Sequence, residues 1–468
     1  MHYISDHISN TQVKTCGQQM KMKTSLSQDS ILLLLIFNVF KVVSNHPLHL
    51  SPYLEQGNIE TAKRLSLVND PTGVIPTSYS GLFTVDEVLK NHLWFWFIPA
   101  INSDPKAPLV IWLTGGPGCS TMLNMFNGNG PLKLTKNSNG NDSYERRVNS
   151  WAQTFSMLYI DNIVYTGYSY SDSGKKGIKT TKDYYTQDLY SFVQQFYKMF
   201  SEMKEKDLYV GGAGSAFKYA ESLAYKIHGD LQAKRDNILL KGIYAGSPLL
   251  DGRTQLRHIY EPFYSLGFIS YKQMINYTQE DEMLNNLNEK NHYLNLESVF
   301  YKMSNLNLEN INTFSSSPDT EINNFMSTDA IKSLLHVGNN TFELCNLEIY
   351  TQSADDVYQP FQPTELVTLL ENYKVLLFTA VFDGIISSPG LEAVLMDMPW
   401  SMQSAYNDSV RTVWREDNVV KGFYTHVGNL CRVVIHNAGM HITNDQLNVT
   451  VQMMEDFWHY GCISNTPQ

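Results

Sequence analysis

Short apolar runs recur along the chain from about residue 90, and polar or glycine-rich turns separate them. They read LWFWFI at 93–98, LVIWL at 109–113, MLYI at 157–160, LYV at 208–210, VLLF at 375–378 and RVVI at 432–435. Continuous apolar runs of this length are typical of strands that are covered on both faces.

Apolar residues with helical spacing fill the stretches between these runs. Two such sets are Leu189, Phe192, Val193, Phe196 and Phe200, and Ala216, Ala220, Leu223, Ala224 and Ile227. Alternating strands and helices predict an α/β fold with a mainly parallel central sheet and helices on both of its faces.

The alternation stops between about residues 251 and 365. This stretch is rich in Asn, Leu, Glu and Ser, keeps helical spacing and lacks runs typical of buried strands. We therefore expect a helical insertion, or cap, at 251–365, which divides the α/β core into a first part at 45–250 and a second part at 366–468.

Residues 1–44 are expected to be a signal-peptide region. The run SILLLLIFNVF at 30–40 is too short to span a bilayer and follows Lys21 and Lys23, as in a signal peptide. Val42 and Ser44 fit the small-residue rule for cleavage after Ser44. The stretch before the run is long for a signal peptide, so Met20 or Met22 is an alternative start, and a signal anchor is the alternative interpretation.

The charge of the chain and its candidate glycosylation sites agree with export. The formal net charge of −11 argues against nucleic acid or an anionic membrane as a partner, since both need a basic face. No later segment is apolar enough to span a membrane, so we expect the mature chain to be secreted or to lie in the lumen of the secretory or lysosomal pathway. Candidate glycosylation sites are Asn141, Asn276, Asn339, Asn407 and Asn448. One of the five cysteines lies in the predicted leader. The other four allow three possible disulfide pairings; they are Cys119, Cys345, Cys431 and Cys462.

The stretch DLYVGGAGSAFKYAESLAYKIH at 207–228 has the layout of a strand, a glycine-rich turn and a helix. In α/β-hydrolases such a turn, called the elbow, holds the nucleophile, and an acid and then a histidine follow along the chain. Here the acid candidate, Asp383, follows the run at 375–378, and a histidine candidate lies in HNAGMHITNDQ at 436–446. This order predicts an α/β-hydrolase fold with its elbow at 212–216.

Long motifs in the same order resemble those of the serine carboxypeptidase family over nearly the whole mature chain. They are WLTGGPGCST at 112–121, NGNGP at 127–131, SWAQTFSMLYIDNIVYTGYSYSD at 150–172, LYVGGAGSAFKY at 208–219 and NAGMHITNDQ at 437–446. The opening LSPYLEQGNIETAKRLSLV and the stretch HVGNNTFE look most like the vitellogenic-like carboxypeptidase branch. The resemblance implies a carboxypeptidase that releases C-terminal residues.

The departures from these motifs fall where the resemblance would place the catalytic triad. Aligned without gaps, the nucleophilic serine of the family lands on Gly214 and its catalytic histidine on Met440. Only the acid, Asp383, is retained. Glycine adopts a strained elbow backbone without steric cost, so the turn can persist without a nucleophile.

The positions that would bind the substrate's terminal carboxylate depart as well. By resemblance these are an asparagine and a glutamate, and here they are Thr114 and Ala213, while a further buried glutamate corresponds to Gly128. The glycine-rich backbone at Gly115 and Gly116, which the family uses for the carboxylate and the oxyanion hole, is kept. The sequence therefore predicts that the site has lost its carboxylate-binding residues together with its catalytic ones.

The alternative is a triad shifted by one residue, formed by Ser215, His441 and Asp383. One step at the start of a helix turns a side chain by about 100 degrees, so Ser215 would point away unless the elbow itself moved. A moved elbow would place Phe217 where family elbows have a small residue. These arguments favour the interpretation without a working triad.

Three functions remain open at this point. The first is a secreted pseudoenzyme that keeps a pocket for peptides or a protein partner, the second is an active carboxypeptidase or acyl-transfer hydrolase with the shifted triad, and the third is a structural or storage glycoprotein. No spacing of His, Cys or carboxylates suggests a metal site, and no cofactor is expected. The sequence leaves the oligomeric state open.

Overall fold

The computed structural model describes residues 46–464, except 138–139, 141, 236, 288–298, 300, 314–317 and 358–360. The predicted signal-peptide region and the sequon asparagine Asn141 lie outside the described residues. Among the helices that are described, none combines the length and the apolar character needed to cross a membrane.

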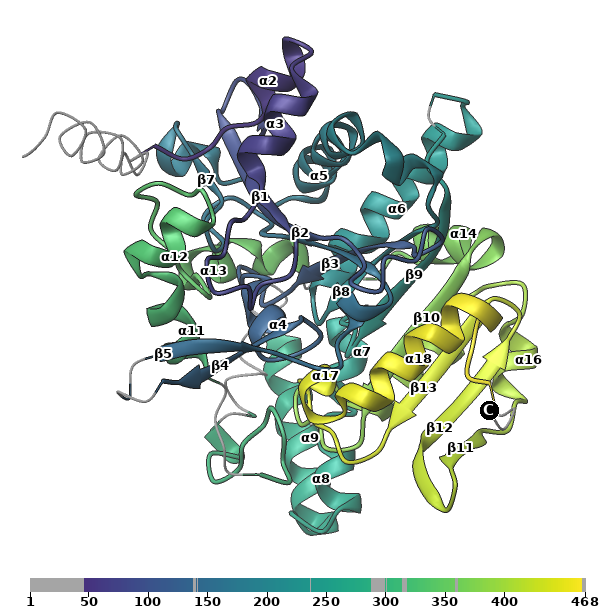
Figure 1. Ribbon diagram of the computed structural model, residues 1–468. Helices are drawn as coiled ribbons and strands as arrows, with labels where there is room; N and C mark the ends of the chain where they lie inside the picture. The colour runs from purple at the N-terminus through teal and green to yellow at the C-terminus, as the bar shows by residue number, and fades with distance from the viewer. Residues whose placement is uncertain are drawn as a thin grey trace, which may run out of the picture. The chain divides into compact units, whose positions relative to one another are not determined.

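A mixed sheet runs through the described chain in the order β1-β2-β6-β3-β8-β9-β10-β13-β12-β11, with β7 paired to β2 (Figure 1). Its strands are β1 Tyr79–Asp86, β2 Asn91–Ile98, β3 Leu109–Thr114, β6 Ser156–Ile160, β7 Tyr170–Ser171, β8 Leu208–Ala213, β9 Leu240–Gly246, β10 Lys374–Ala380, β11 Thr412–Glu416, β12 Val419–Val427 and β13 Leu430–Ile435. In this sheet order, the strands β6, β3, β8, β9, β10 and β13 run parallel to their neighbours. Antiparallel strands extend the sheet at both edges. All six predicted runs form strands of this sheet. A separate hairpin pairs β4 Leu132–Lys136 with β5 Asp142–Arg146.

Helices cover both faces of the sheet, as predicted. They are α2 Ser51–Glu55, α3 Ile59–Ser66, α4 Met122–Phe126, α5 Lys182–Met199, α6 Ala216–Gln232, α7 Gly252–Arg257, α8 Glu261–Ser265, α9 Tyr271–Leu287, α11 Asp319–Met326, α12 Asp329–Leu334, α13 Leu347–Val357, α14 Thr364–Asn372, α15 Ser388–Asp397, α16 Gln403–Asn407, α17 Ile442–Asp445 and α18 Leu447–Tyr460. Alternate residues of β2 enter different cores: Phe95 packs with Phe192 of α5, whereas Trp96 packs with Phe126 of α4. This two-sided burial explains why β2 reads as a continuous apolar run.

The elements described between β9 and β10 are helices, from α7 to α14. Because β9 pairs directly with β10, this stretch leaves the sheet unbroken. Several of its residues form an apolar cluster of their own: Leu256, Ile259, Tyr260, Phe263, Ile269, Val299, Met303, Leu308 and Ile311. The domain bounds at 45–250, 251–365 and 366–468 stay a prediction.

Two disulfide bonds select one of the three possible pairings, Cys119 with Cys345 and Cys431 with Cys462. The first joins the turn after β3 to the segment that precedes α13. The second joins β13 to the residues after α18 and so closes the C-terminal end of the fold.

Candidate active site

The elbow lies between β8, which ends at Ala213, and α6, which begins at Ala216. At its tip Gly214 has a φ of +62°, a left-handed conformation in which an L side chain is strained. The Gly214 amide donates a hydrogen bond of 3.0 Å to the carbonyl of Gly246 at the end of β9. The strand, turn and helix expected from the sequence are therefore present, and a glycine occupies the tip.

The tip of the elbow faces the loop after β13. A Cβ added to Gly214 would contact one atom within 4 Å, the Cε of Met440, at 3.7 Å. The two positions that correspond by resemblance to the nucleophile and the histidine thus meet in space, as those of a triad would. The groups that meet there are a backbone Cα and a thioether methyl group, neither of which transfers a proton.

A cavity of about 30 Å³ remains at this point. Its lining comes from the ends of β3, β8, β9 and β10, from α4 and from the loop after β13: Trp112, Thr114, Gly115, Leu123, Asn124, Ala213, Gly214, Gly246, Ser247, Phe378, Met440, His441, Ile442 and Thr443. A cavity of this volume holds no more than a few water molecules. The cavity is therefore far smaller than a pocket that encloses a peptide terminus.

Asp383 is completely buried just after β10. Its carboxylate accepts hydrogen bonds from the Ser247 hydroxyl at 2.6 Å and from the amides of Ile385 and Ile386 at 2.9 and 2.8 Å. Burial raises the pKa of Asp383 to about 6. Its partners are thus a hydroxyl and two amides, and no histidine in the described part of the chain is hydrogen-bonded to it.

His441, one residue beyond Met440, lines the cavity but pairs elsewhere. Its Nε2 lies 3.4 Å from Oε2 of Glu309, an ion-pair contact longer than a well-formed hydrogen bond. Burial lowers the pKa of His441, but the neighbouring Glu309 carboxylate more than offsets this, so the pKa lies above its ordinary value.

Ser215 is buried beside the elbow but is not one of the cavity-lining residues named above. Its Oγ has no hydrogen-bond partner among the described residues. A Cβ on Gly115 would lie only 2.5 Å from this oxygen, so the hydroxyl points at the glycine turn after β3. The structure therefore brings Asp383, His441 and Ser215 into one region without the hydrogen bonds that would link them as a triad.

The glycine turn after β3 approaches the elbow closely. A Cβ on Gly115 would lie 2.4 Å from the amide nitrogen of Ala216, so only glycine fits at this position. The Gly115 amide donates to the carbonyl of Ala213 at 3.1 Å, while Gly116 lies against Cys119. The backbone predicted to hold an oxyanion is present, but the Gly115 donor is already used.

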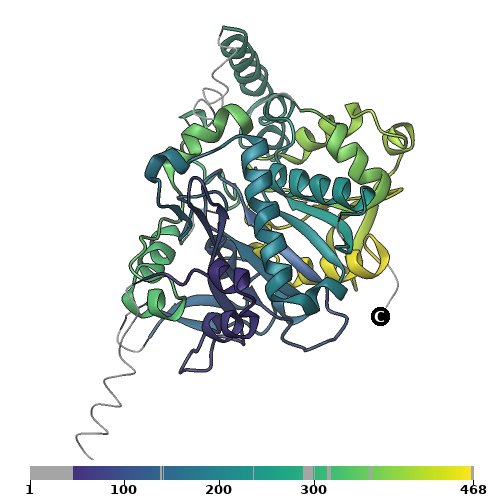
Figure 2. The same ribbon diagram turned by 90° about the horizontal axis from the view of Figure 1, so that it is seen from above.

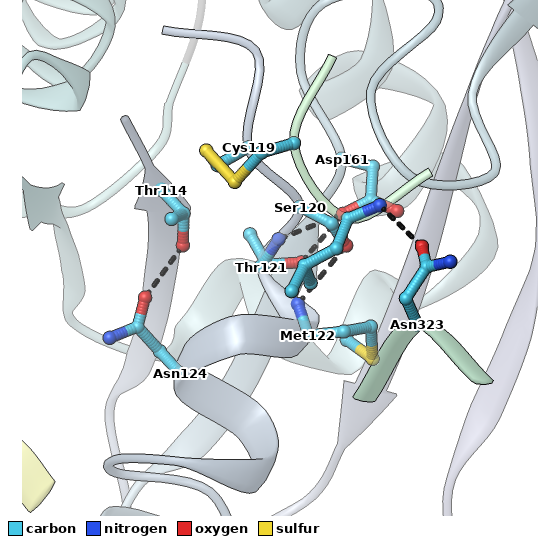
Figure 3. The surroundings of a disulfide bond; sticks show 10 residues. Thr114, Cys119, Ser120, Thr121, Met122, Asn124, Asp161 and Asn323 are labelled. Atoms are coloured by element: carbon cyan, nitrogen blue, oxygen red, sulfur yellow. Dashed lines mark hydrogen bonds between the residues drawn. A yellow bond between two sulfur atoms is a disulfide. The ribbon is translucent and has the colours of Figure 1, made fainter. Parts of the chain in front are cut away.

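The positions predicted for carboxylate binding hold small side chains. The Thr114 hydroxyl donates to the side-chain carbonyl of Asn124 at 2.8 Å, and Figure 3 shows the two side chains pointing at each other. Ala213 lines the same cavity. A Cβ on Gly128 would lie 2.6 Å from Oγ1 of Thr443, so a glutamate at position 128 would collide with that side chain.

A buried carboxylate fixes the turn that carries Cys119 (Figure 3). Asp161 accepts hydrogen bonds from the Ser120 hydroxyl at 2.7 Å and from the amide and hydroxyl of Thr121, both at 2.9 Å. Burial raises the pKa of Asp161 to about 6. This cluster holds the β3 turn in place whether or not the neighbouring cavity carries out any chemistry.

Sequence reasoning missed four residues of the site: Asn124, Ser247, Glu309 and Thr443. Ser247 has a φ of +44° at the end of β9, a strand whose glycines and lysine hide its apolar character. Glu309 comes from the insertion, and only the folded chain brings it to His441. No group of three or more His, Cys, Asp or Glu residues that could hold a metal ion occurs within the part of the chain described here.

Comparisons with known proteins agree with this architecture. The family model for serine carboxypeptidases matches residues 70–460. A probable serine carboxypeptidase, CPVL, of Pongo abelii is 32% identical over 418 residues, which are 85% of this chain and 86% of that protein. The vitellogenic carboxypeptidase of Aedes aegypti is 30% identical over 440 residues, 89% and 90% of the two chains.

A solved structure shares the fold. It is the Kex1 prohormone-processing carboxypeptidase of Saccharomyces cerevisiae, which covers 85% of this chain and 96% of its own with a TM-score of 0.72 at 20% identity. The α/β-hydrolase fold and the resemblance to vitellogenic-like carboxypeptidases are thereby confirmed. On the family match and the two relatives, the chain belongs to the serine carboxypeptidase family.

Proposed function

We propose that this chain is a non-catalytic member of the serine carboxypeptidase family. The single observation that carries the proposal is the meeting of Gly214 and Met440 across the elbow, with Met440 Cε at 3.7 Å from a Cβ built on Gly214. Nucleophilic catalysis needs a hydroxyl or thiol beside a base. Gly214 offers no hydroxyl or thiol, and Met440 offers no base.

The arrangement around Asp383 supports the same proposal. A triad acid orients its histidine, whereas Asp383 has its hydrogen bonds with Ser247 and two backbone amides. The acid has a structural use that does not depend on a histidine, which gives a physical reason for its presence in a site without chemistry.

We propose that the protein acts in the secretory pathway, either after secretion or in the lumen. Two disulfides are typical of an oxidising compartment. The side chains of the four described sequon asparagines, Asn276, Asn339, Asn407 and Asn448, are exposed, so glycans could be attached without unfolding.

The proposal includes the retention of a peptide ligand at the elbow. A cavity of about 30 Å³ admits a peptide C-terminus only if Met440 swings aside, which the flexible methionine side chain permits. Protection of the protein from thermal unfolding by C-terminal peptides would support retained binding. The absence of protection would favour a structural or storage glycoprotein.

A serine-directed fluorophosphonate probe tests the absence of a nucleophile. We expect no covalent adduct on the wild-type protein, with Ser215→Ala as the matched control, when intact mass is followed by peptide mapping. An adduct on Ser215 that the control variant loses would overturn the proposal and support the shifted triad.

A further inference from the structure

A second cavity, of about 220 Å³, lies between α5, α6 and the segment around α13 and α14. Its lining residues are Lys182, Tyr185, Lys218, Glu221, Leu250, Asp356, Phe361 and Gln362. None of them lines the elbow cavity. Figure 2 shows α5 and α6 side by side over the sheet, and Tyr185 of α5 packs against Tyr219 of α6 at a ring distance of 4.6 Å.

One wall of this cavity carries a buried carboxyl group, that of Glu221, which accepts a backbone hydrogen bond from Leu366 but has one oxygen without a partner among the described residues. Glu221 is 7% exposed, and its Oε1 has no hydrogen-bond partner among the described residues. Burial, with the nearby Glu365 carboxylate, raises the pKa of Glu221 to about 7. An unpaired acceptor in such a place is costly unless a donor reaches it.

One turn earlier on α6, the same wall carries an ammonium group with spare donors. Nζ of Lys218 donates to the backbone carbonyl of Asp356 at 3.3 Å, and it forms no ion pair in the described part of the chain. Residues three apart on a helix lie on one face. Lys218 and Glu221 therefore offer a cation and an anion to the same space.

The two other charged residues that line the cavity, Lys182 and Asp356, already have partners. Nζ of Lys182 pairs with Glu365 at 2.6 Å, and the Asp356 carboxylate accepts from the Lys182 amide and from the Tyr185 hydroxyl, both at 3.2 Å. A simple anion would meet repulsion from Glu221 and Asp356, and a simple cation would meet repulsion from Lys218. A ligand with one positive and one negative group can place each group beside the residue of opposite charge and so avoids both repulsions.

We propose that this cavity binds a free α-amino acid with a small aliphatic side chain. Its carboxylate would accept from Lys218, its ammonium would donate to Glu221, and its side chain would contact Leu250 and Phe361. The volume is of the order that one such molecule needs, and it is below the range of pockets for larger ligands. The proposal is independent of the elbow, since the two cavities share no residue.

Calorimetric titration of the full chain with leucine tests the proposal, together with two analogues that each lack one charge, 4-methylpentanoate and 3-methylbutylamine. We expect saturable binding of leucine and at least about ten-fold weaker binding of either analogue, because each loses one charge-assisted hydrogen bond. Equal binding of an analogue, or no saturable binding of leucine because the cavity holds water only, would overturn the proposal.

Variants add a second and separate test. Lys218→Met should weaken leucine binding by about ten-fold or more. Lys226→Met, on the same helix but outside the cavity lining and paired with Asp230, should leave it unchanged. Equal effects of the two substitutions would overturn the assignment of Lys218. The analogue titrations use the wild-type protein, so they remain decisive if a variant fails to fold.

Discussion

At the scale of single residues, Gly214 and Met440 meet in space at the two positions that correspond by resemblance to the nucleophile and the histidine of the family. The turn keeps its left-handed backbone at Gly214, with a φ of +62°, because glycine adopts this conformation without cost. Elbow geometry therefore survives independently of the nucleophile, and a conserved-looking turn in the sequence is no guarantee of activity.

Restoring the triad alone should not restore efficient carboxypeptidase activity. We expect the double variant Gly214→Ser, Met440→His to hydrolyse a blocked dipeptide about two to four orders of magnitude less efficiently in kcat/KM than the quadruple variant that adds Thr114→Asn and Ala213→Glu. The reason is that at least two hydrogen bonds to the substrate carboxylate are missing, each worth roughly 1.5–3 kcal/mol.

Steady-state kinetics of the two variants at equal concentration make this comparison, with the Gly214→Ser single variant as control. A double variant as fast as the quadruple variant would show that Thr114 and Ala213 do not limit the site.

The Asp383→Asn substitution should leave any residual hydrolysis unchanged and should instead alter the pH dependence of stability. In a working triad, removing this charge costs about 10⁴ in turnover. Here the folded-state pKa of about 6 lies above the ordinary value of about 3.9. The stabilisation from the protonated form is therefore complete below about pH 4 and is lost as the pH rises through 6.

Chemical denaturation at several pH values measures this effect. Relative to Asp383→Asn, the wild type should lose on the order of 3 kcal/mol of unfolding free energy between pH 4 and pH 8. A pH-independent difference would show that burial does not perturb Asp383. Ser247→Ala, which removes one hydrogen bond and keeps the carboxyl group, is the matched control.

At the scale of helices and strands, the continuous apolar runs predicted the strands that are buried on both faces, such as β3 and β8. The pattern missed β11, at the edge of the sheet, and its neighbour β12, because exposed polar residues interrupt their apolar ones. It also missed β9, where Lys241 and two glycines break the run. Edge strands depend on their neighbours more than on their own composition.

Only those parts of the candidate site that lie within sequence motifs could be predicted from the sequence. Residues Gly214, Met440 and Asp383 could be placed from their order along the chain, whereas Glu309 and Ser247 could not. Those two reach the site through the packing of the insertion and through a strained turn after β9. Neither feature leaves a periodic signal in the sequence.

The two disulfides should differ in their contribution to stability. The Cys119–Cys345 bond closes a span of 226 residues and the Cys431–Cys462 bond one of 31. Loop-closure entropy predicts contributions of about 5 and about 4 kcal/mol respectively. Thermal unfolding of the two paired Cys→Ala variants makes the comparison, and a larger loss for the Cys431, Cys462 pair would contradict it.

At the scale of the whole molecule, the acidic charge, the disulfides and the exposed sequons all fit an exported glycoprotein. We expect the purified chain from a eukaryotic secretory host to begin near residue 45 and to carry glycans on at least two of its sequons. Intact mass before and after glycosidase treatment measures both features. An unmodified chain that begins at Met1 would refute the prediction of export.

The family fold, the meeting of Gly214 with Met440 and the small elbow cavity together support the proposal of a carboxypeptidase scaffold without carboxypeptidase chemistry. Hydrolysis of blocked dipeptides by the purified, glycosylated protein, measured across acid and neutral pH beside Ser215→Ala, tests this claim most directly. We predict that neither protein exceeds the rate of the buffer at any pH. Turnover by the wild type that Ser215→Ala abolishes would contradict the claim and establish a working shifted triad.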